Sequence, residues 1–397
     1  VQVITEKDIK LRNVQTASDA VAMATGVSAS NSVEGTVNLR GYNSKNILVL
    51  VDGQQMNTAW DGDVDWNMIP VENIRKIEVV SGGQSALYGG RAVGGVINIM
   101  TKSEKRDGVH GSAVVSYGSH GTVKQAYAVH GKKDKLSWGT FYESKITNGW
   151  KDFLSTGTRK EKTKGDGNLG SVPGYDADAS GNPIIGNRGN KYVMSESYGF
   201  NMGYSFNDDQ KLTYKYTHSN YAWHYTDPVS FLKDDNGNEI WHGNLKNTNG
   251  TTIAVTPYNL LGNNGWRAYD MHSLTYNDQK NKVHAHFGLT DYTKDGYTYI
   301  SSKNTGLEGA GTKSSYPSKS WDFDINKRWT WGAHTVLAGA SYGEDRFDQK
   351  VYDITNWRLW NSSRVDNKTE THGGKDKSYA LYLQDKWSIS SKWTTYI

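Results

Sequence analysis

Two patterns of hydrophobic and polar positions divide the chain. Up to about residue 103, short apolar runs such as Ile47–Val51 and Ile77–Val80 alternate with helix-like segments, which indicates a small α+β domain. From about residue 104 onward, long segments alternate apolar and polar residues with a period of two, as strands with one apolar face do. We therefore expect two domains, at 1–103 and 104–397.

The first domain shows local start and stop signals. The segment VQVITEKDI at its start predicts a short strand followed by the beginning of a helix. The segment Ser18–Thr25 is helix-like, and Gly26 is a plausible end for it. A further short helix is expected over Ile69–Ile74, where Pro70 favours a helix start.

The second domain has the alternation of a membrane β-barrel. Tyr198, Phe200, Met202, Tyr204 and Phe206 occupy every second position and are separated by Gly, Asn and Ser. A barrel strand needs this arrangement, because one face meets lipid and the other meets a wet lumen. The strand predicted around residues 378–389 divides its apolar and polar side chains in the same way.

The connections between these strands alternate in length. Short turns are expected near 132–135, 207–210, 279–282, 330–333 and 388–392, and long connections at about 147–192, 226–267, 296–316 and 349–376. Outer-membrane barrels combine tight periplasmic turns with long extracellular loops. We count about eleven strands in this chain, whereas barrels with a plugged lumen have about 22. Because a bilayer does not tolerate an open sheet edge, we expect the natural protein to continue beyond Ile397.

A family resemblance rests on the segment Val37–Lys102. It contains, in order, Arg40-Gly41, then LVLVDG, IPVENIRKIEVV, SALYG and GGVINI, and it ends in Thr101-Lys102. Several weak motifs in this order resemble the plug domain of TonB-dependent outer-membrane receptors. The resemblance implies a transmembrane antiparallel β-barrel with an N-terminal α+β plug.

The same resemblance implies a function. Such receptors lie in the outer membrane of Gram-negative (diderm) bacteria and import scarce metal chelates. TonB and its inner-membrane energising complex drive the import with the proton gradient. The expected cargo is a ferric siderophore, with cobalamin or haem as alternatives. A passive surface receptor or adhesin is a second class. The expected partners are TonB, the chelate and outer-membrane lipid, and no cofactor is expected to be tightly bound.

Composition narrows these alternatives. The absence of cysteine excludes disulfides and thiolate metal sites. The net charge of +4 is mild and no Lys/Arg run is concentrated, so nucleic acid is not an expected partner. The 25 Tyr and 14 Trp suit a barrel with aromatic girdles, although other β-proteins share such a composition. All eleven histidines lie at or after His110, which argues against a haem ligand from the plug.

The candidate ligand contacts are aromatic, polar or charged residues expected at the plug apex and in the extracellular loops. An anionic aromatic chelate would suit such surfaces through stacking, cation–π contact and charge. The candidates are Tyr42, Asn43, Trp60, Asp61, Asp63 and Trp66 on the plug, and Trp223, Tyr225, Trp266 and Arg267 near the loops.

Charged residues of the plug are candidates for holding it against the barrel. Buried charge pairs specify a position without adding much net stability. The residues expected to do this are Arg40, Arg75, Glu78 and Arg91, together with Glu72. The chain departs from the family nearby, because Ser81 and Gly83 stand where Arg and Pro are usual, and Arg91 where a small or polar residue is usual.

Two acidic runs partly match calcium loops. Asp61, Asp63 and Asp65 alternate as Ca²⁺ ligands do, but Glu72 at the twelfth position follows a predicted helix. A second run, Asp176 and Asp178, has no Glu at its twelfth position. Solvated carboxylates or ligand contacts are the alternatives, and we assign no metal site.

We do not expect an enzyme. No H-E-x-x-H motif occurs, and no set of Ser, His and Asp residues has a catalytic arrangement. The glycine-rich stretch Gly82–Gly95 lacks the spacing of a phosphate-binding loop, so we interpret it as tight turns inside the plug.

Overall fold

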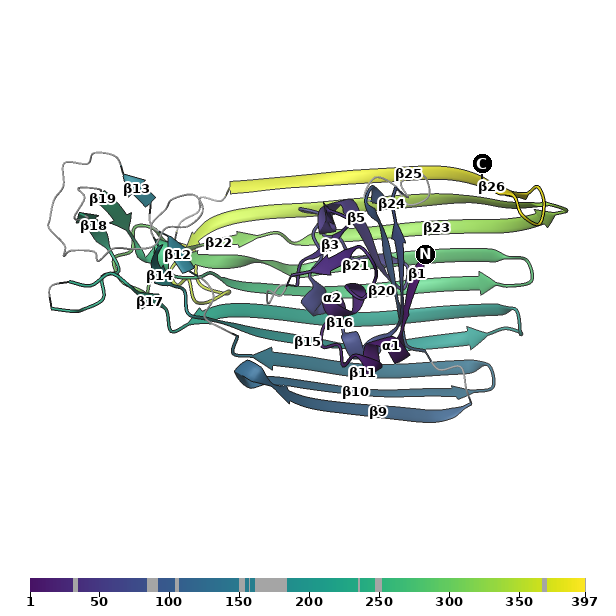
Figure 1. Cartoon of the computed structure of the whole chain (residues 1–397), viewed down its shortest axis with the longest axis horizontal. Helices are drawn as coiled ribbons and strands as arrows, with labels where there is room; N and C mark the ends of the chain where they lie inside the picture. Colours follow the sequence, from purple (N-terminus) through teal and green to yellow (C-terminus); the bar gives the residue numbers. More distant parts are fainter. Residues whose placement is uncertain are drawn as a thin grey trace.

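A computed structural model provides the structure of the chain. It describes residues 1–30, 35–83, 92–103, 107–149, 154–156, 158–160, 184–234, 236–246, 252–365 and 370–396. The N-terminal domain, here called the plug, lies against one face of a large curved sheet, here called the wall (Figure 1). No helix within these residues is long and apolar enough to cross a membrane.

The plug is built on a five-stranded sheet with the order β1-β7-β8-β5-β6. Among the described residues its only parallel pair is β5 with β8, in which Val49 lies opposite Ile97, and a small sheet β2-β3-β4 adjoins it. The plug elements are β1 (Gln2–Thr5), α1 (Glu6–Leu11), α2 (Ala17–Val21), β2 (Val27–Ala29), β3 (Val37–Leu39), β4 (Tyr42–Asn43), η1 (Ser44–Asn46), β5 (Ile47–Val51), β6 (Gln54–Gln55), η2 (Trp66–Met68), η3 (Val71–Asn73), β7 (Ile74–Ser81) and β8 (Gly95–Thr101).

Local chemistry explains where the plug helices begin. Helix α1 starts at a capping box in which Thr5 and Asp8 each accept a hydrogen bond from the other's backbone. Helix α2 is capped by Thr16 and ends at Val21, several residues before the expected end at Thr25. The chain then turns at Gly26, whose φ of +82° strongly favours glycine.

The wall is a 12-stranded antiparallel sheet whose neighbours follow chain order. Strands β22 and β23 both lie between β21 and β24, so the sheet has eleven positions, as expected. The wall strands are β9 (Gly108–Gly118), β10 (Thr122–Lys133), β11 (Leu136–Thr147), β15 (Asn190–Ser205), β16 (Gln210–Thr226), β20 (Asn264–Asp278), β21 (Val283–Ile300), β22 (Gly311–Ser315), β23 (Ser318–Trp331), β24 (His334–Ile354), β25 (Glu370–Ser388) and β26 (Thr394–Tyr396).

Most short turns and the long connections lie at opposite ends of the wall, and the three-residue turn between β9 and β10 is an exception (Figure 1). The five short turns fall where the sequence predicts them, at the right-hand end of the view. The longer connections gather at the left, and the strands extend further into them than expected. They carry β12 (Leu154–Thr156), β13 (Thr158–Lys160), β14 (Ile184–Asn187), β17 (Val229–Ser230), β18 (Gly243–Lys246), β19 (Thr252–Val255) and α4 (Pro257–Leu260), whereas η5 (Ser119–Gly121) forms the short turn between β9 and β10 at the same end.

The period-two pattern assigns the two faces of the wall correctly. The apolar set from Tyr198 to Phe206 is exposed on the face away from the plug, where it forms part of an apolar outer surface. Ser197, Asn201 and other alternate residues are buried on the inner face. The wall therefore has the outward apolar and inward polar surface of a membrane barrel.

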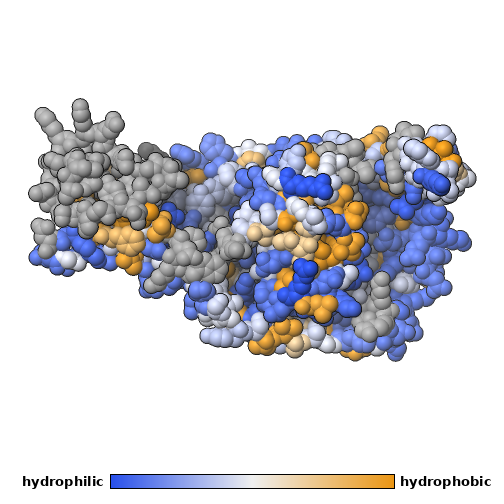
Figure 2. Space-filling model, viewed as in Figure 1, coloured by the Kyte–Doolittle hydropathy of each residue, from blue (hydrophilic) through white to orange (hydrophobic). Residues whose placement is uncertain are grey.

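The main hydrophobic core belongs to the plug and the wall together. Plug residues such as Trp66 and Met68 pack with Tyr221, Tyr269 and Tyr292 of the wall in one buried cluster. The opposite face of the plug, seen in Figure 2, mixes hydrophobic and hydrophilic residues. The apolar contacts seen here therefore tie the plug to strands β15, β16, β20 and β21.

Candidate functional site

The first contact between plug and wall is an ion-pair bridge. Arg267 of β20 lies 3.2 Å from a carboxylate oxygen of plug Asp65, and its Nε lies 3.0 Å from Asp295 of β21. The Asp65 and Asp295 side chains are only 5% and 2% exposed, so each depends on the guanidinium to offset its charge. Arg267 therefore fixes the plug loop that precedes η2.

A second anchor joins η3 to β10 and β11. The Lys124 ammonium lies 2.6 Å from Glu72 of the plug, so the expected wall partner of Glu72 exists. Glu143 accepts hydrogen bonds from the backbone N–H groups of Val71 and Glu72, at 3.2 and 2.9 Å. A wall carboxylate thus caps a short plug helix whose first N–H groups lack intrahelical partners.

A third anchor lies nearer the short-turn end of the wall. Asp52, in the turn after β5, pairs with Lys215 of β16 at 2.7 Å. Thr101 donates its hydroxyl to Asp52 at 2.6 Å and contacts the same ammonium at 2.8 Å. Ser273 adds a hydrogen bond to the Asp52 carbonyl.

Wall hydroxyls also donate to plug carbonyls. Ser219 and Tyr269 donate to the Met68 carbonyl at 2.9 and 2.8 Å, and Tyr292 donates to the Met56 carbonyl at 3.2 Å. These buried bonds satisfy carbonyls that the plug's own elements leave free. They are specific in geometry, and each contributes about 1 kcal/mol.

The residues predicted to hold the plug make other contacts. Glu78 pairs with Lys76 at 2.6 Å, and Arg75 donates to the Met100 sulfur at 3.9 Å, both within the plug. Arg40 has φ +50° and packs its side chain on Gly26. Arg91 lies outside the described residues. Their contact with a barrel stays a prediction, whereas Asp52 and Asp65 were missed as anchors.

Above the plug, an aromatic path leads from its apex to the long loops. Trp60 of the plug stacks on Tyr316 of the wall with ring centroids 4.2 Å apart. Tyr316 is followed by Tyr297 at 6.1 Å, Tyr297 by Tyr299 at 6.0 Å, and Tyr299 by Tyr258 at 5.6 Å. Sequence reasoning found Trp60 but missed these tyrosines, although the alternation of Tyr297 and Tyr299 indicates a shared face.

A lysine side chain lies beside this path, in the space between the plug apex and the long loops, which is here called the vestibule. Lys191 of β15 is 2% exposed, and its ammonium lies 5.4 Å from the Trp223 ring and 5.8 Å from the Tyr225 ring. Trp223 also donates to Asn263. Trp223 and Tyr225, both predicted ligand contacts, therefore lie on the inner face of β16, where Trp223 is buried and Tyr225 half-buried.

Tyr42 and Asn43 are exposed beside the loop that carries Trp60. The adjacent Ser44 hydrogen-bonds to Asp63, and the Asn57 amide donates to the Ser44 carbonyl at 3.1 Å. The structure thus joins the two predicted apical loops of the plug, and ligand contact there stays a prediction.

The carboxylates of the acidic run Asp61–Asp65 are bound by other residues of the protein. Asp61 accepts from Thr58 and from the Asp63 backbone, while Asp65 pairs with Arg267. Across the described parts of the chain, no group of three or more His, Cys, Asp or Glu side chains is placed to hold a metal ion. The second candidate, Asp176 and Asp178, lies outside those parts.

Three predicted ligand contacts need correction. Trp66 is 1% exposed in the shared core, so its ring is closed to a ligand in this conformation. Arg267 is held by two carboxylates and is not a free cation. Trp266 lies on the opposite face of β20 from Arg267, near Trp360 at 5.2 Å, because adjacent strand residues point to opposite sides.

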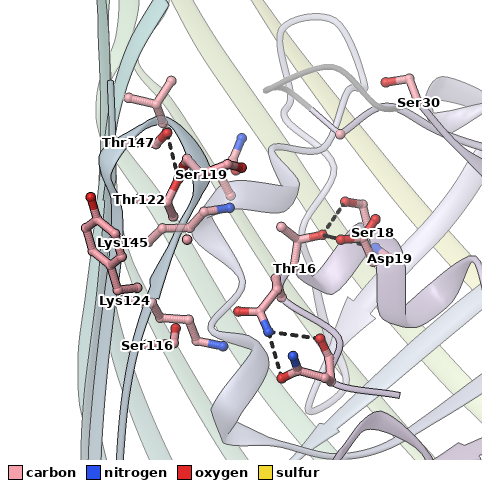
Figure 3. A pocket seen from close by; sticks show the side chains of 17 residues that line it. Thr16, Ser18, Asp19, Ser30, Ser116, Ser119, Thr122, Lys124, Lys145 and Thr147 are labelled. Carbon is pink, nitrogen blue, oxygen red and sulfur yellow. Dashed lines mark hydrogen bonds between the residues drawn. The ribbon is translucent and has the colours of Figure 1, made fainter. Parts of the chain in front are cut away.

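A separate polar cavity of about 480 Å³ lies between α2 and strands β9, β10 and β11. Figure 3 shows Lys124 and Lys145 extending from the wall toward the plug residues Thr16 and Asp19. Asp19 accepts a hydrogen bond from Thr16 at 2.6 Å. Most of the other lining side chains are neutral hydroxyls and amides, so this side of the plug faces a hydrophilic space.

One sequence match to a catalytic motif has no structural support. Gly339–Gly343 reads G-x-S-x-G, but it lies inside strand β24. A nucleophile elbow requires a sharp strand-to-helix turn, which presents the serine above a sheet. Ser341 is therefore an ordinary strand residue.

Comparison with known proteins identifies the N-terminal domain. A family model described as the TonB-dependent receptor plug domain matches residues 1–96. The vitamin B12 transporter BtuB of Vibrio vulnificus (strain YJ016) is 36% identical over 145 residues, which cover 36% of this chain and 24% of the relative. BtuB of Vibrio cholerae (strain M66-2) is 39% identical over 110 residues, or 27% of this chain and 18% of the relative.

Solved structures extend the likeness to the wall. The ferric enterobactin receptor PfeA of Pseudomonas aeruginosa superposes with a TM-score of 0.59 at 16% identity, over 98% of this chain and 60% of that one. The siderophore receptor PirA of Acinetobacter baumannii gives a TM-score of 0.58 at 17% identity, over 98% and 59%. The chain thus spans about three fifths of these receptors. Their family consists of transporters and receptors rather than enzymes. Residues 1–96 thus match the plug domain of TonB-dependent receptors, and the chain as a whole has the fold of such a receptor's plug with part of its β-barrel.

Proposed function

We propose that this protein imports a metal chelate, most directly a ferric siderophore, across the outer membrane of a Gram-negative bacterium. The proton gradient of the inner membrane supplies the energy through TonB. The chelate binds from outside, in the vestibule above the plug, and passes into the periplasm when the plug is displaced.

The observation that supports this cargo is the stack of Trp60 on Tyr316. It joins the movable plug to an aromatic path on the wall that continues through Tyr297, Tyr299 and Tyr258. Aromatic faces favour a ligand with flat aromatic groups. A ferric chelate with aromatic donor groups has this chemistry.

The same stack offers a way to signal occupancy. A ligand that inserts between plug and wall at Trp60 binds more tightly when the plug is in one position than when it is in the other. Only such a difference can shift the plug between states. The anchors at Asp52, Asp65 and Glu72 then hold the plug until TonB pulls.

Cobalamin is the second candidate cargo. It is favoured by the 36% identity over 145 residues to a vitamin B12 transporter. That identity covers 36% of this chain and 24% of the relative, so it supports a shared receptor fold more strongly than the choice of ligand.

Intrinsic Trp fluorescence of the receptor in detergent tests the cargo. We would titrate it with ferric catecholates, ferric hydroxamates, haem and cobalamin. Quenching by ferric siderophores alone is the expected result, and quenching by cobalamin alone would select the second candidate. If Ala at both Trp60 and Tyr42 left affinity within about 0.5 kcal/mol, the apical assignment would be dropped.

Energy coupling needs a separate test. Uptake of the labelled chelate by cells is expected to stop when the proton gradient is abolished or TonB is deleted. Uptake that continued unchanged would indicate a passive receptor or adhesin instead.

A further inference from the structure

A second cavity, of about 230 Å³, lies at the upper end of the aromatic path. It is bounded by the segment after β14, the α4 region and the Ile300 end of β21. Its side chains include Arg188, Tyr258, Asn263, Tyr297 and Tyr299. None of these was among the ligand contacts expected from the sequence.

Arg188 is the unusual member of this cavity. Its Nε is buried and lacks a hydrogen-bond partner among the residues that the structure describes. No ion pair with a described carboxylate joins it, in contrast to Arg267, which is held by Asp65 and Asp295. A buried guanidinium N–H without an acceptor is destabilising, and an anionic oxygen would satisfy it.

Three tyrosine rings line the same cavity as Arg188. The rings of Tyr258 and Tyr299 meet at 71° with centroids 5.6 Å apart, and Tyr297 lies 6.0 Å from Tyr299. Tyr297 and Tyr299 project from the same face of β21 as Asp295, which meets Arg267 on the plug side. The cavity therefore combines aromatic faces with a guanidinium that has no ion-pair partner among the described residues.

We propose that this cavity binds an aryl oxyanion of the cargo, such as one catecholate arm of a ferric chelate. The arm stacks on Tyr297 and Tyr299, and its oxygens accept hydrogen bonds from Arg188. This assignment rests on the proposed transport function and adds a specificity site to it. The aromatic path then continues from this cavity to Trp60, where the plug begins.

The test uses the receptor in detergent, titrated with the iron(III) complex of 2,3-dihydroxybenzoate and, separately, with iron(III) tris-acetohydroxamate. Arg188→Gln removes the charge, and Tyr299→Ala removes the stacking ring. Arg358→Gln is the matched control, because Arg358 is 41% exposed and pairs with Glu308 at 3.1 Å.

Arg188→Gln and Tyr299→Ala are each expected to weaken binding of the aryl complex at least tenfold. Neither is expected to change hydroxamate binding more than twofold, and Arg358→Gln is expected to leave both ligands within twofold. Unchanged near-UV circular dichroism establishes that the variants fold. The proposal is overturned if Arg188→Gln binds the aryl complex within twofold of the wild type.

Failure of the transport function would look different. In that case the wild type would import no chelate in a proton-gradient-dependent manner. If the wild type imports a hydroxamate chelate but does not bind the aryl complex, transport stands and the assignment of this cavity is wrong.

Discussion

The guanidinium of Arg267 on the wall lies 3.2 Å from the carboxylate of Asp65 on the plug. Residues 202 positions apart in the chain thus form one of the links between the two domains. Arg267 also holds Asp295, so one side chain offsets two nearly buried negative charges. The arrangement makes the plug loop before η2 sensitive to a single wall residue.

Replacing Arg267 is expected to loosen the plug more than any exposed ion pair does. Arg267→Met leaves Asp65 and Asp295 buried without a counter-charge, which costs about 3–5 kcal/mol. Urea unfolding and hydrogen exchange at Trp66–Met68 measure the effect. Arg358→Met removes an exposed pair and serves as the control, with an expected change below about 1 kcal/mol. Equal effects of the two variants would contradict the bridge.

Substitution of Trp66 is expected to reduce stability, whereas substitution of Trp60 is expected to reduce ligand affinity. Trp66→Ala removes a side chain that is 1% exposed and should cost about 3–5 kcal/mol of unfolding free energy. Trp60 is half-buried at the vestibule, so Trp60→Ala should mainly reduce chelate affinity. Unfolding curves and fluorescence titrations on both variants check this. A larger affinity loss for Trp66→Ala than for Trp60→Ala would reverse our correction.

Gly288 marks a close approach between wall and plug. A Cβ built there would lie 1.4 Å from the Gln54 side-chain oxygen, and Gln54 is fully buried. Gly288→Ala should therefore displace the β5–β6 turn and destabilise the docked plug by about 1–3 kcal/mol. Limited proteolysis and thermal unfolding report the displacement. Gly306→Ala, where no atom lies within 4 Å of the new Cβ, should change stability by less than about 0.5 kcal/mol.

The start of α1 should be sensitive to acid. Hydrogen bonds from the Thr5 hydroxyl and backbone N–H lower the pKa of Asp8 below its usual value. The folded state therefore binds a proton less readily than the unfolded chain. The stabilisation is fully present above the unfolded pKa, near 3.9, and is lost as pH falls through the lower folded pKa.

Carboxyl chemical shifts recorded between about pH 6 and 2 should give an Asp8 midpoint below that of an unstructured Asp, near 3.9. Thr5→Ala should move this midpoint upward, and Thr5→Ser, which keeps the hydroxyl, should not. If the Asp8 midpoint were the same in Thr5→Ala as in the wild type, the capping box would be excluded as the cause of the lowered pKa.

Much of the architecture follows from local sequence. Period-two alternation around Tyr198–Phe206 predicts strand, inner face and outer face together, because lipid and lumen impose opposite polarity on neighbouring residues. The buried run Ile47–Val51 becomes β5 as expected. Helix α2 is shorter than its pattern, because the N–H groups of Met23 and Ala24 bond to the carbonyls three residues back, at Ala20 and Val21, and so continue the chain as turns.

The candidate site could be predicted from the sequence less fully than the fold. The sequence by itself determined which residues are aromatic or charged and, through strand parity, which of them share a face. Only the tertiary structure decided which partners they meet: Arg267 was expected to meet a ligand but meets Asp65, Trp66 enters the core, and Arg188 is left without a partner among the described residues. The physical reason is that contacts between plug and wall join residues 50 to more than 200 positions apart. No local pattern encodes such pairs, because they exist only after the wall curves around the plug.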